Sequence, residues 1–270
     1  MKLSFSGGSE GAKAFFLGVP FDSTSSFRPG SRFAPEAIRQ ASCNFESYDC
    51  FLKKEPEGIV DFGDLSRSVN YEDLEMELTS LLRLHKEHFP IIAGGEHSIT
   101  PIIVSEMKGR YDNLFVITLD AHMDFRRSYM GTENSHACAS RKVSEIVGIE
   151  NMLLMGLRSF SREEAEGSKN LEYYTSLEVR ERLDELCDRI DDIKNNIYLS
   201  IDMDCFDPAY APAVGNPEPY GLNPLEVRRI IESASPKLVG FDIVELCPPY
   251  DNGNTACLAA KLVHEIALRR

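Results

Sequence analysis

Residues 120–124, which read DAHMD, place a polar side chain at every second position. They directly follow the apolar run Leu114–Leu119, which is typical of a buried strand. In an extended chain, residues i, i+2 and i+4 point to the same side. We therefore expect Asp120, His122 and Asp124 to converge at the end of this strand, with the alanine and methionine between them facing away.

The same spacing occurs a second time. Asp202 and Asp204 directly follow the apolar run Ile197–Ile201, so their carboxylates should also share one side of a strand end. A third run, Phe89–Ala93, leads into two glycines that allow a tight turn before His97. Because the carboxyl ends of parallel strands meet at one edge of a sheet, we expect the three segments to share that edge.

Taken alone, each segment is also typical of a turn or a helix cap. Together, the four aspartates would repel one another strongly unless they were protonated or neutralised. Two divalent cations would neutralise them, with His97 and His122 as neutral ligands, and this set of oxygen and nitrogen donors suits Mn²⁺. Six ligands can give two ions four protein contacts each only if some carboxylates bridge, as in two-metal hydrolases that activate a water.

The elements that must position these residues alternate along the whole chain. We predict seven strands, at Ala14–Val19, Gly58–Val60, Phe89–Ala93, Leu114–Leu119, Met152–Gly156, Ile197–Ile201 and Leu238–Val244. N-cap residues predict helices after Asn70, after Thr175 and after Asn223. This alternation predicts an α/β fold with a mostly parallel sheet and helices on both faces. Since no linker or repeat interrupts it, we expect one domain over residues 1–270, with its long loops at 20–33, 125–136 and 206–221.

Composition narrows the possible partners. Asp and Glu total 43 against 29 Lys and Arg, a net charge of −14, which disfavours nucleic acid and anionic membranes and suits a cationic ligand. No window reaches the roughly 20 apolar residues of a membrane span, and the first residues lack the features of a secretory signal. The seven cysteines show no CxxC spacing, so we expect reduced thiols and a cytoplasmic protein.

Several motifs resemble the signature blocks of the ureohydrolase (arginase/agmatinase) family. They are GGEHS at 94–98, DAHMD at 120–124, SIDMDCFDPAYAP at 200–212 and DIVELCPPYD at 242–251. The segment GVPFDSTSSFRPGSRFAPEAIR at 18–39 is similar to the agmatinase branch. The resemblance implies an arginase-like, three-layer α/β/α fold, a binuclear manganese centre, and hydrolysis of a guanidino group to an amine and urea.

The resemblance also implies a role for individual residues. One Mn²⁺ would be held by His97, Asp120, Asp124 and Asp202. The other would be held by His122, Asp120, Asp202 and Asp204, so that Asp120 and Asp202 bridge the two ions. Glu96, where many relatives have Asp, lies next to a ligand and is expected to support it rather than to bind metal.

Two further residues are expected to act on the substrate. Glu245 matches the family's substrate carboxylate, and a carboxylate there can accept a bidentate pair from a guanidinium. His136 matches the family's loop histidine and is expected to shuttle protons to the leaving amine or to hydrogen-bond the substrate. Asp124, together with the metals, is expected to stabilise the tetrahedral intermediate and to take up its proton. The alternatives are a helix-capping or ion-paired glutamate and an ordinary loop histidine.

The identity of the substrate depends on weaker signals. In the loop before His136, Asn134 could bind a carboxylate, whereas Glu133 beside it would attract an amine, as would Glu218. This acidic entrance favours agmatine, giving putrescine, or aminopropyl-agmatine, giving spermidine, which would place the enzyme in polyamine biosynthesis. The alternatives are arginase, guanidinobutyrase or formiminoglutamase activity, the last with Arg126 and Arg127 as cationic groups. A metal-binding or polyamine-binding regulator without catalysis is a third class. The resemblance implies a homo-oligomer, either a trimer or a hexamer.

Overall fold

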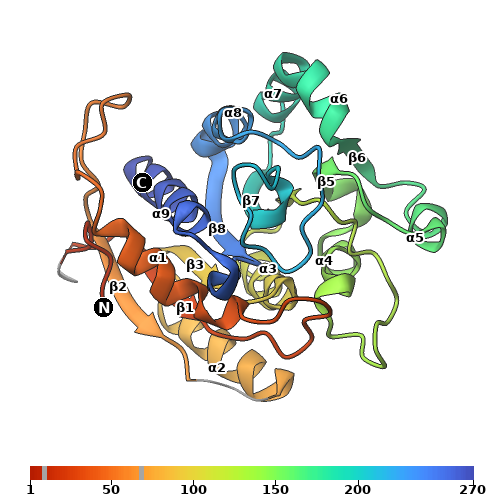
Figure 1. Cartoon of the computed structure of the whole chain (residues 1–270), viewed down its shortest axis with the longest axis horizontal. Helices are drawn as coiled ribbons and strands as arrows, with labels where there is room; N and C mark the ends of the chain where they lie inside the picture. The colour runs from red at the N-terminus through yellow and green to blue at the C-terminus, as the bar shows by residue number, and fades with distance from the viewer. Residues whose placement is uncertain (8–10, 67–69) are drawn as a thin grey trace.

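A computed structural model describes residues 1–7, 11–66 and 70–270. Within these residues, eight strands form one sheet in the order β2-β1-β3-β8-β7-β4-β5-β6, and every neighbouring pair is parallel. The strands are β1 (Ala14–Val19), β2 (Ile59–Asp64), β3 (Phe89–Gly94), β4 (Leu114–Leu119), β5 (Met152–Leu157), β6 (Glu172–Thr175), β7 (Asn196–Asp202) and β8 (Leu238–Val244). In Figure 1 the two edge strands, β2 and β6, lie on opposite sides of the molecule.

Helices cover both faces of the sheet (Figure 1). They are α1 (Ala34–Ser42), α2 (Tyr71–Leu84), α3 (Thr100–Lys108), α4 (Ala139–Val147), α5 (Arg162–Gly167), α6 (Ser176–Glu181), α7 (Leu183–Asp191), α8 (Pro224–Ala234) and α9 (Asn254–Leu268). The apolar sides of α1, α6, α7, α8 and α9 pack in one core, and those of α2, α3 and α4 in the other. Successive residues of β1 alternate between the two cores, as the pleat of a strand requires. The predicted three-layer α/β/α architecture is therefore confirmed.

The predicted helix starts lie where their caps are. The Asn70 side chain accepts a hydrogen bond from Asp73 N at the start of α2. Capping boxes begin α6 at Thr175 and α8 at Asn223. The stretch predicted as one helix after Thr175 is two helices: α6 ends at Glu181, and α7 begins at Leu183 after the single residue Arg182.

The sheet differs from the prediction at its edges. β6 was not predicted, because its sequence EYYT is polar, short and only half-buried, as suits an edge strand. At the other edge, β2 continues four residues beyond the predicted Gly58–Val60. In the centre of the sheet, β3, β8, β7 and β4 are consecutive neighbours, so their carboxyl ends lie side by side. The candidate site lies at these four ends.

Among the described residues, no helix combines the length and the apolar character needed to cross a bilayer.

Candidate metal centre and active site

A tight turn after β3 delivers His97 to the site. A Cβ atom on Gly95 would lie 1.7 Å from the carbonyl oxygen of Phe21, so this position accepts only glycine. The turn continues into a short 3₁₀ helix, His97–Ile99, whose first residue is almost fully buried. The backbone N–H of His97 donates to Glu245 Oε1 at 2.8 Å, so the turn after β3 and the end of β8 are joined.

Two of the candidate residues have unusual backbone conformations. Asp124 has a φ of 49° and Glu245 a φ of 63°, in the left-handed region that non-glycine residues rarely adopt. Such strain persists only where the surrounding structure holds the chain in place, and it is frequent at functional sites. Glu245 directly follows β8, Asp124 lies in the segment after β4, and both carboxylates line the same pocket.

The first candidate metal group surrounds His97. Its Nδ1 lies 3.1 Å from Asp120 Oδ2, 3.2 Å from Asp124 Oδ2 and 3.4 Å from Asp202 Oδ2. All four side chains are buried. The ligand atoms of His97, Asp120 and Asp202 all lie within 4.8 Å of one another, so these three residues could hold one cation, and Asp124 Oδ2 lies beside the same nitrogen.

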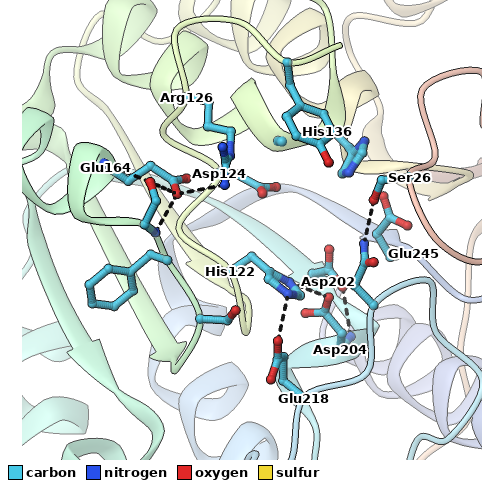
Figure 2. A pocket seen from close by; sticks show the side chains of 16 residues that line it. Ser26, His122, Asp124, Arg126, His136, Glu164, Asp202, Asp204, Glu218 and Glu245 are labelled. Carbon is cyan, nitrogen blue, oxygen red and sulfur yellow. Dashed lines mark hydrogen bonds and ion pairs between the residues drawn. The ribbon is translucent and has the colours of Figure 1, made fainter.

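The second candidate metal group surrounds His122. Its Nδ1 lies 2.9 Å from Asp204 Oδ2 and 3.8 Å from Asp120 Oδ1. On the other edge of the ring, Nε2 lies 3.8 Å from Glu218 Oε1, and Figure 2 shows His122 between Asp204 and Glu218. Asp120 therefore directs one oxygen to each group, which is the arrangement that a bridging carboxylate requires.

The buried charges and unpartnered atoms of these two groups fit a site that binds cations, because the protein alone does not balance them. His97 Nδ1 and Asp120 Oδ2 are buried and find no hydrogen-bond partner among the described residues, although they lie 3.1 Å apart. Burial, reinforced by the charges of Asp124 and Asp204, raises the pKa of Asp120 to about 7. Burial and the charges of Asp204 and Asp120 likewise raise the pKa of Asp202. Without a cation, the cluster can relieve its repulsion only by binding protons.

The surroundings of His122 also carry an excess of negative charge. Burial disfavours its charged form, but the charge of Asp204 and their hydrogen bond outweigh burial and raise the pKa of His122 to about 11. Conversely, although burial opposes ionisation of Asp204, the positive charge of His122 lowers its pKa. A divalent cation would replace these protons, since metal ligands must be deprotonated.

A pocket of about 410 Å³ opens over both groups (Figure 2). Of the residues predicted for the site and its entrance, it is lined by His122, Asp124, His136, Asp202, Asp204, Glu218 and Glu245. Burial and the nearby charge of Glu96 raise the pKa of Glu245. A carboxylate in that environment gains strongly from a cationic partner, which is what a guanidinium provides.

Two predicted residues lie elsewhere. Neither Glu133 nor Asn134 lines this pocket: Glu133 is exposed beside a separate hollow with Arg127, and Asn134 accepts a hydrogen bond from Lys142 in another. Within the loop 125–136 that carries them, Arg126, Tyr129 and His136 line the pocket, whereas Glu133 and Asn134 do not.

Sequence reasoning did not identify a buried network behind His97. His97 Nε2 lies 3.2 Å from Ser200 Oγ, and Ser200 Oγ donates to Asp242 Oδ1 at 2.5 Å. Tyr198 and Thr100 also donate to Asp242, at 2.7 and 2.9 Å. The available signal was a charged residue inside the apolar strand LVGFDIV, because a buried carboxylate needs several donors.

Comparison with known proteins identifies the family of the chain. The model of the Arginase family matches residues 12–268. The chain is 36% identical to an agmatinase from Bacillus cereus, with 96% of this chain and 92% of that one aligned. It is 35% identical to an N(1)-aminopropylagmatine ureohydrolase from Thermococcus kodakarensis, over 94% and 89% of the two chains. The crystal structure of an agmatine ureohydrolase from Thermoplasma volcanium superposes with a TM-score of 0.93 at 41% identity, over 100% of this chain and 94% of that one. The chain therefore belongs to the arginase family and is a ureohydrolase of the arginase/agmatinase type.

Proposed function

We propose that this ureohydrolase releases urea from agmatine or aminopropyl-agmatine, leaving putrescine or spermidine, with two Mn²⁺ per subunit. The observation that carries the substrate class is the charge of the pocket. Its lining includes the carboxylates of Asp124, Glu164, Asp202, Asp204, Glu218 and Glu245. Among the described lining residues the one Lys or Arg side chain is Arg126, whose guanidinium lies 3.7 Å from Glu164. A substrate carboxylate would find no unpaired cation there, whereas a guanidinium with a distal amine finds anions.

The proposed cation sites follow the two groups around His97 and His122. His97, Asp120, Asp124 and Asp202 would hold one ion, and His122, Asp120, Asp202 and Asp204 the other. The donor set supports this assignment, because buried imidazoles and carboxylates with unpartnered atoms suit Mn²⁺ better than a thiolate-preferring metal. When bound, the two ions supply positive charge and Lewis acidity for the attack of water.

The protein side chains then perform three tasks. Glu245 accepts two hydrogen bonds from the guanidinium and fixes its plane relative to the attacking water. Asp124 takes up the proton that the water releases. His136, in its protonated imidazolium form, gives one ring proton to the leaving amine and becomes neutral, since a neutral amine leaves more easily than an amide-like anion. The strained conformations of Asp124 and Glu245 support this division of roles.

We also propose that residues 1–270 form one catalytic domain that works in the cytoplasm as a trimer or hexamer. A single sheet and a family match over residues 12–268 support one domain. The seven free cysteines are compatible with a reducing compartment. The oligomer rests on the resemblance to the family, and size-exclusion chromatography with light scattering would test it.

A screen of product release tests the substrate. Mn²⁺-loaded protein would be assayed with agmatine, aminopropyl-agmatine, arginine and guanidinobutyrate for urea, and with formiminoglutamate for formamide. We expect agmatine or aminopropyl-agmatine to give the highest kcat/KM. Turnover of formiminoglutamate without turnover of agmatine would overturn the proposed substrate, and the absence of any product would overturn the catalytic role.

A further inference from the structure

His136 begins a short 3₁₀ helix, His136–Cys138, at the end of the loop that follows β4. Its side chain is buried apart from the edge that lines the pocket. The ring of Tyr129 packs edge-on against it, with 5.8 Å between the ring centroids. An imidazole that gives a proton to a substrate must present the correct nitrogen, and the hydrogen bond at the other nitrogen decides which one that is. The surroundings of Nδ1 therefore determine what His136 can do.

Thr24, from the loop after β1, contacts His136 twice. Its Oγ1 lies 3.1 Å from His136 Nδ1, and the same oxygen accepts the backbone N–H of His136 at 3.1 Å. Ser135 Oγ also lies near Nδ1, at the longer distance of 3.4 Å, where it accepts from Ala137 N. Thr24 is thus the nearest partner of Nδ1, although 112 residues separate it from His136 in the sequence.

Glu96 fixes the direction of the Thr24 hydroxyl. Glu96 is fully buried, and its Oε2 accepts the backbone N–H of Thr24 at 2.7 Å. Its Oε1 accepts from Thr24 Oγ1 and from Ser98 Oγ, both at 2.7 Å. The carboxylate therefore holds Thr24 through both its backbone and its side chain.

Counting protons then assigns the tautomer of His136. A threonine hydroxyl has one proton and two lone pairs. The proton of Thr24 is donated to Glu96, and one lone pair accepts the backbone N–H of His136. Thr24 can therefore only accept from the ring, and because its contact with Nδ1 is shorter than that of Ser135 Oγ, 3.1 Å against 3.4 Å, the geometry favours a hydrogen on Nδ1. In the neutral imidazole, Nε2 is then the unprotonated nitrogen.

We propose that Glu96, acting through Thr24, is a positioning residue that fixes the Nδ1–H tautomer of His136 and makes Nε2 the nitrogen that exchanges protons with the substrate. This inference rests on the proposed function for its catalytic consequence. The tautomer itself is a property of the resting protein and can be measured without substrate. Glu96 and Thr24 touch neither the candidate cations nor the reacting carbon in this account.

Neutron crystallography of the Mn²⁺-loaded wild-type enzyme tests the tautomer directly. In deuterium-exchanged crystals, at a pH where the imidazole is neutral, we expect deuterium on Nδ1 of His136 and the deuteron of the Thr24 hydroxyl directed at Glu96. Deuterium on Nε2 alone, or a Thr24 hydroxyl directed at the ring, would overturn the proposal. This result is independent of whether any substrate turns over, so it separates the tautomer from the proposed function.

Variants of Thr24 test the consequence. Thr24→Val removes the hydroxyl at nearly constant volume, and we expect kcat for agmatine to fall on the order of 10²-fold with KM within about twofold, since general acid catalysis contributes at least that much. Thr24→Ser retains the hydroxyl and should recover most of kcat. Thr132→Val, in the loop after β4, removes a hydroxyl that bonds Asn134 N and not His136, and it serves as the control.

The outcomes are distinct. Wild-type kcat in Thr24→Val, or an equal loss in Thr24→Ser and Thr24→Val, would overturn the positioning role. If Thr24→Val does not fold, the neutron result and Thr24→Ser still decide. Absence of urea from all substrates with the wild-type enzyme would instead overturn the proposed function and leave the tautomer assignment standing.

Discussion

Two carboxylate clusters in the described part of the chain differ in how their charge is balanced: one joins the buried Asp61 to the exposed Asp64, and the other is formed by the candidate metal groups. In the first, Arg39 is almost fully buried and binds both oxygens of Asp61, at 2.9 and 3.0 Å, and Asp64 at 2.5 Å. The backbone N–H groups of Leu3 and Gly63 also donate to Asp61. Although burial opposes ionisation, these donors lower the pKa of Asp61. In this cluster, at the end of β2, donors within the protein balance the carboxylate charge, and we call it the complete cluster.

In the second cluster, at the ends of β4 and β7, the chain does not balance the carboxylate charge, and we call it the incomplete cluster. Four aspartates meet two imidazoles, and the buried atoms His97 Nδ1 and Asp120 Oδ2 are without hydrogen-bond partners in the described part of the chain. Burial and like charges raise the pKa of Asp120, opposite to the change at Asp61. The contrast teaches that burial of carboxylates alone does not mark a metal site. The distinguishing property is negative charge that the chain itself does not neutralise.

The largest expected effect is at the carboxylate shared by the two metal groups. Asp120→Asn should lower kcat/KM for agmatine by about 10³-fold or more, because losing several kcal/mol of charge stabilisation corresponds to that factor. Isothermal titration with Mn²⁺ should show weaker uptake of both ions. Asp64→Asn, in the complete cluster, is the matched control and should retain Mn²⁺ uptake and urea release. Near-normal activity of Asp120→Asn would refute the bridging role.

The complete cluster should respond in stability and not in chemistry. Arg39→Met removes the buried guanidinium from Asp61 and leaves only backbone donors and the exposed Lys2, 3.9 Å away, so we expect the free energy of unfolding to fall by about 3–5 kcal/mol. Thermal or chemical unfolding followed by circular dichroism measures this loss. Arg39→Met combined with Asp61→Leu should recover much of it, because no buried charge remains without a partner. A single variant as stable as the wild type would show that Arg39 does not neutralise this cluster.

A variant of Glu245 separates substrate binding from metal binding within the site. Glu245→Gln removes the charge that pairs with the guanidinium, and we expect kcat/KM for agmatine to fall by about 10²-fold, as for loss of a charged, bidentate contact that orients the reacting group. Uptake of Mn²⁺ should be unchanged, since Glu245 is not among the proposed ligands. A loss of metal uptake equal to that of Asp120→Asn would mean that Glu245 supports the metal site and not the substrate.

The smallest expected effect concerns the network behind His97. Ser200 lies between His97 Nε2 and the buried carboxylate of Asp242. Such support of a ligand histidine typically contributes about 10- to 100-fold in metal affinity. We expect Ser200→Ala to weaken Mn²⁺ binding by about 10-fold, measured by titration, and Ser200→Thr, which keeps the hydroxyl, to lose less. Equal losses in both variants would indicate a packing effect.

The features that could be predicted from the sequence are those that depend on residues close together along the chain. The capping residues at Asn70, Thr175 and Asn223 and the apolar central strands were predicted because caps and buried strands are encoded within a few residues. The proximity of the metal-group residues was predicted for the same reason, since each follows a strand of one parallel sheet. The edge strand β6 was missed because its pattern is polar.

The features that were missed depend on packing between distant segments. The contact of Thr24 with His136 and the contact of Ser200 with Asp242 join segments 112 and 42 residues apart, and no local pattern encodes them. For Glu133 and Asn134, the sequence showed only that they precede His136. The path of the loop, which turns both residues into other hollows, depends on contacts such as that of Lys142 with Asn134.

The central claim is that the incomplete cluster binds two cations and that urea release depends on them. Titration of Mn²⁺ into metal-free protein, with bound metal and urea release from agmatine measured on the same samples, tests it most directly. We predict two ions bound per chain, no urea release without metal, and full activity as the sites fill. Full urea release by metal-free protein, or no uptake of Mn²⁺ at all, would contradict the account.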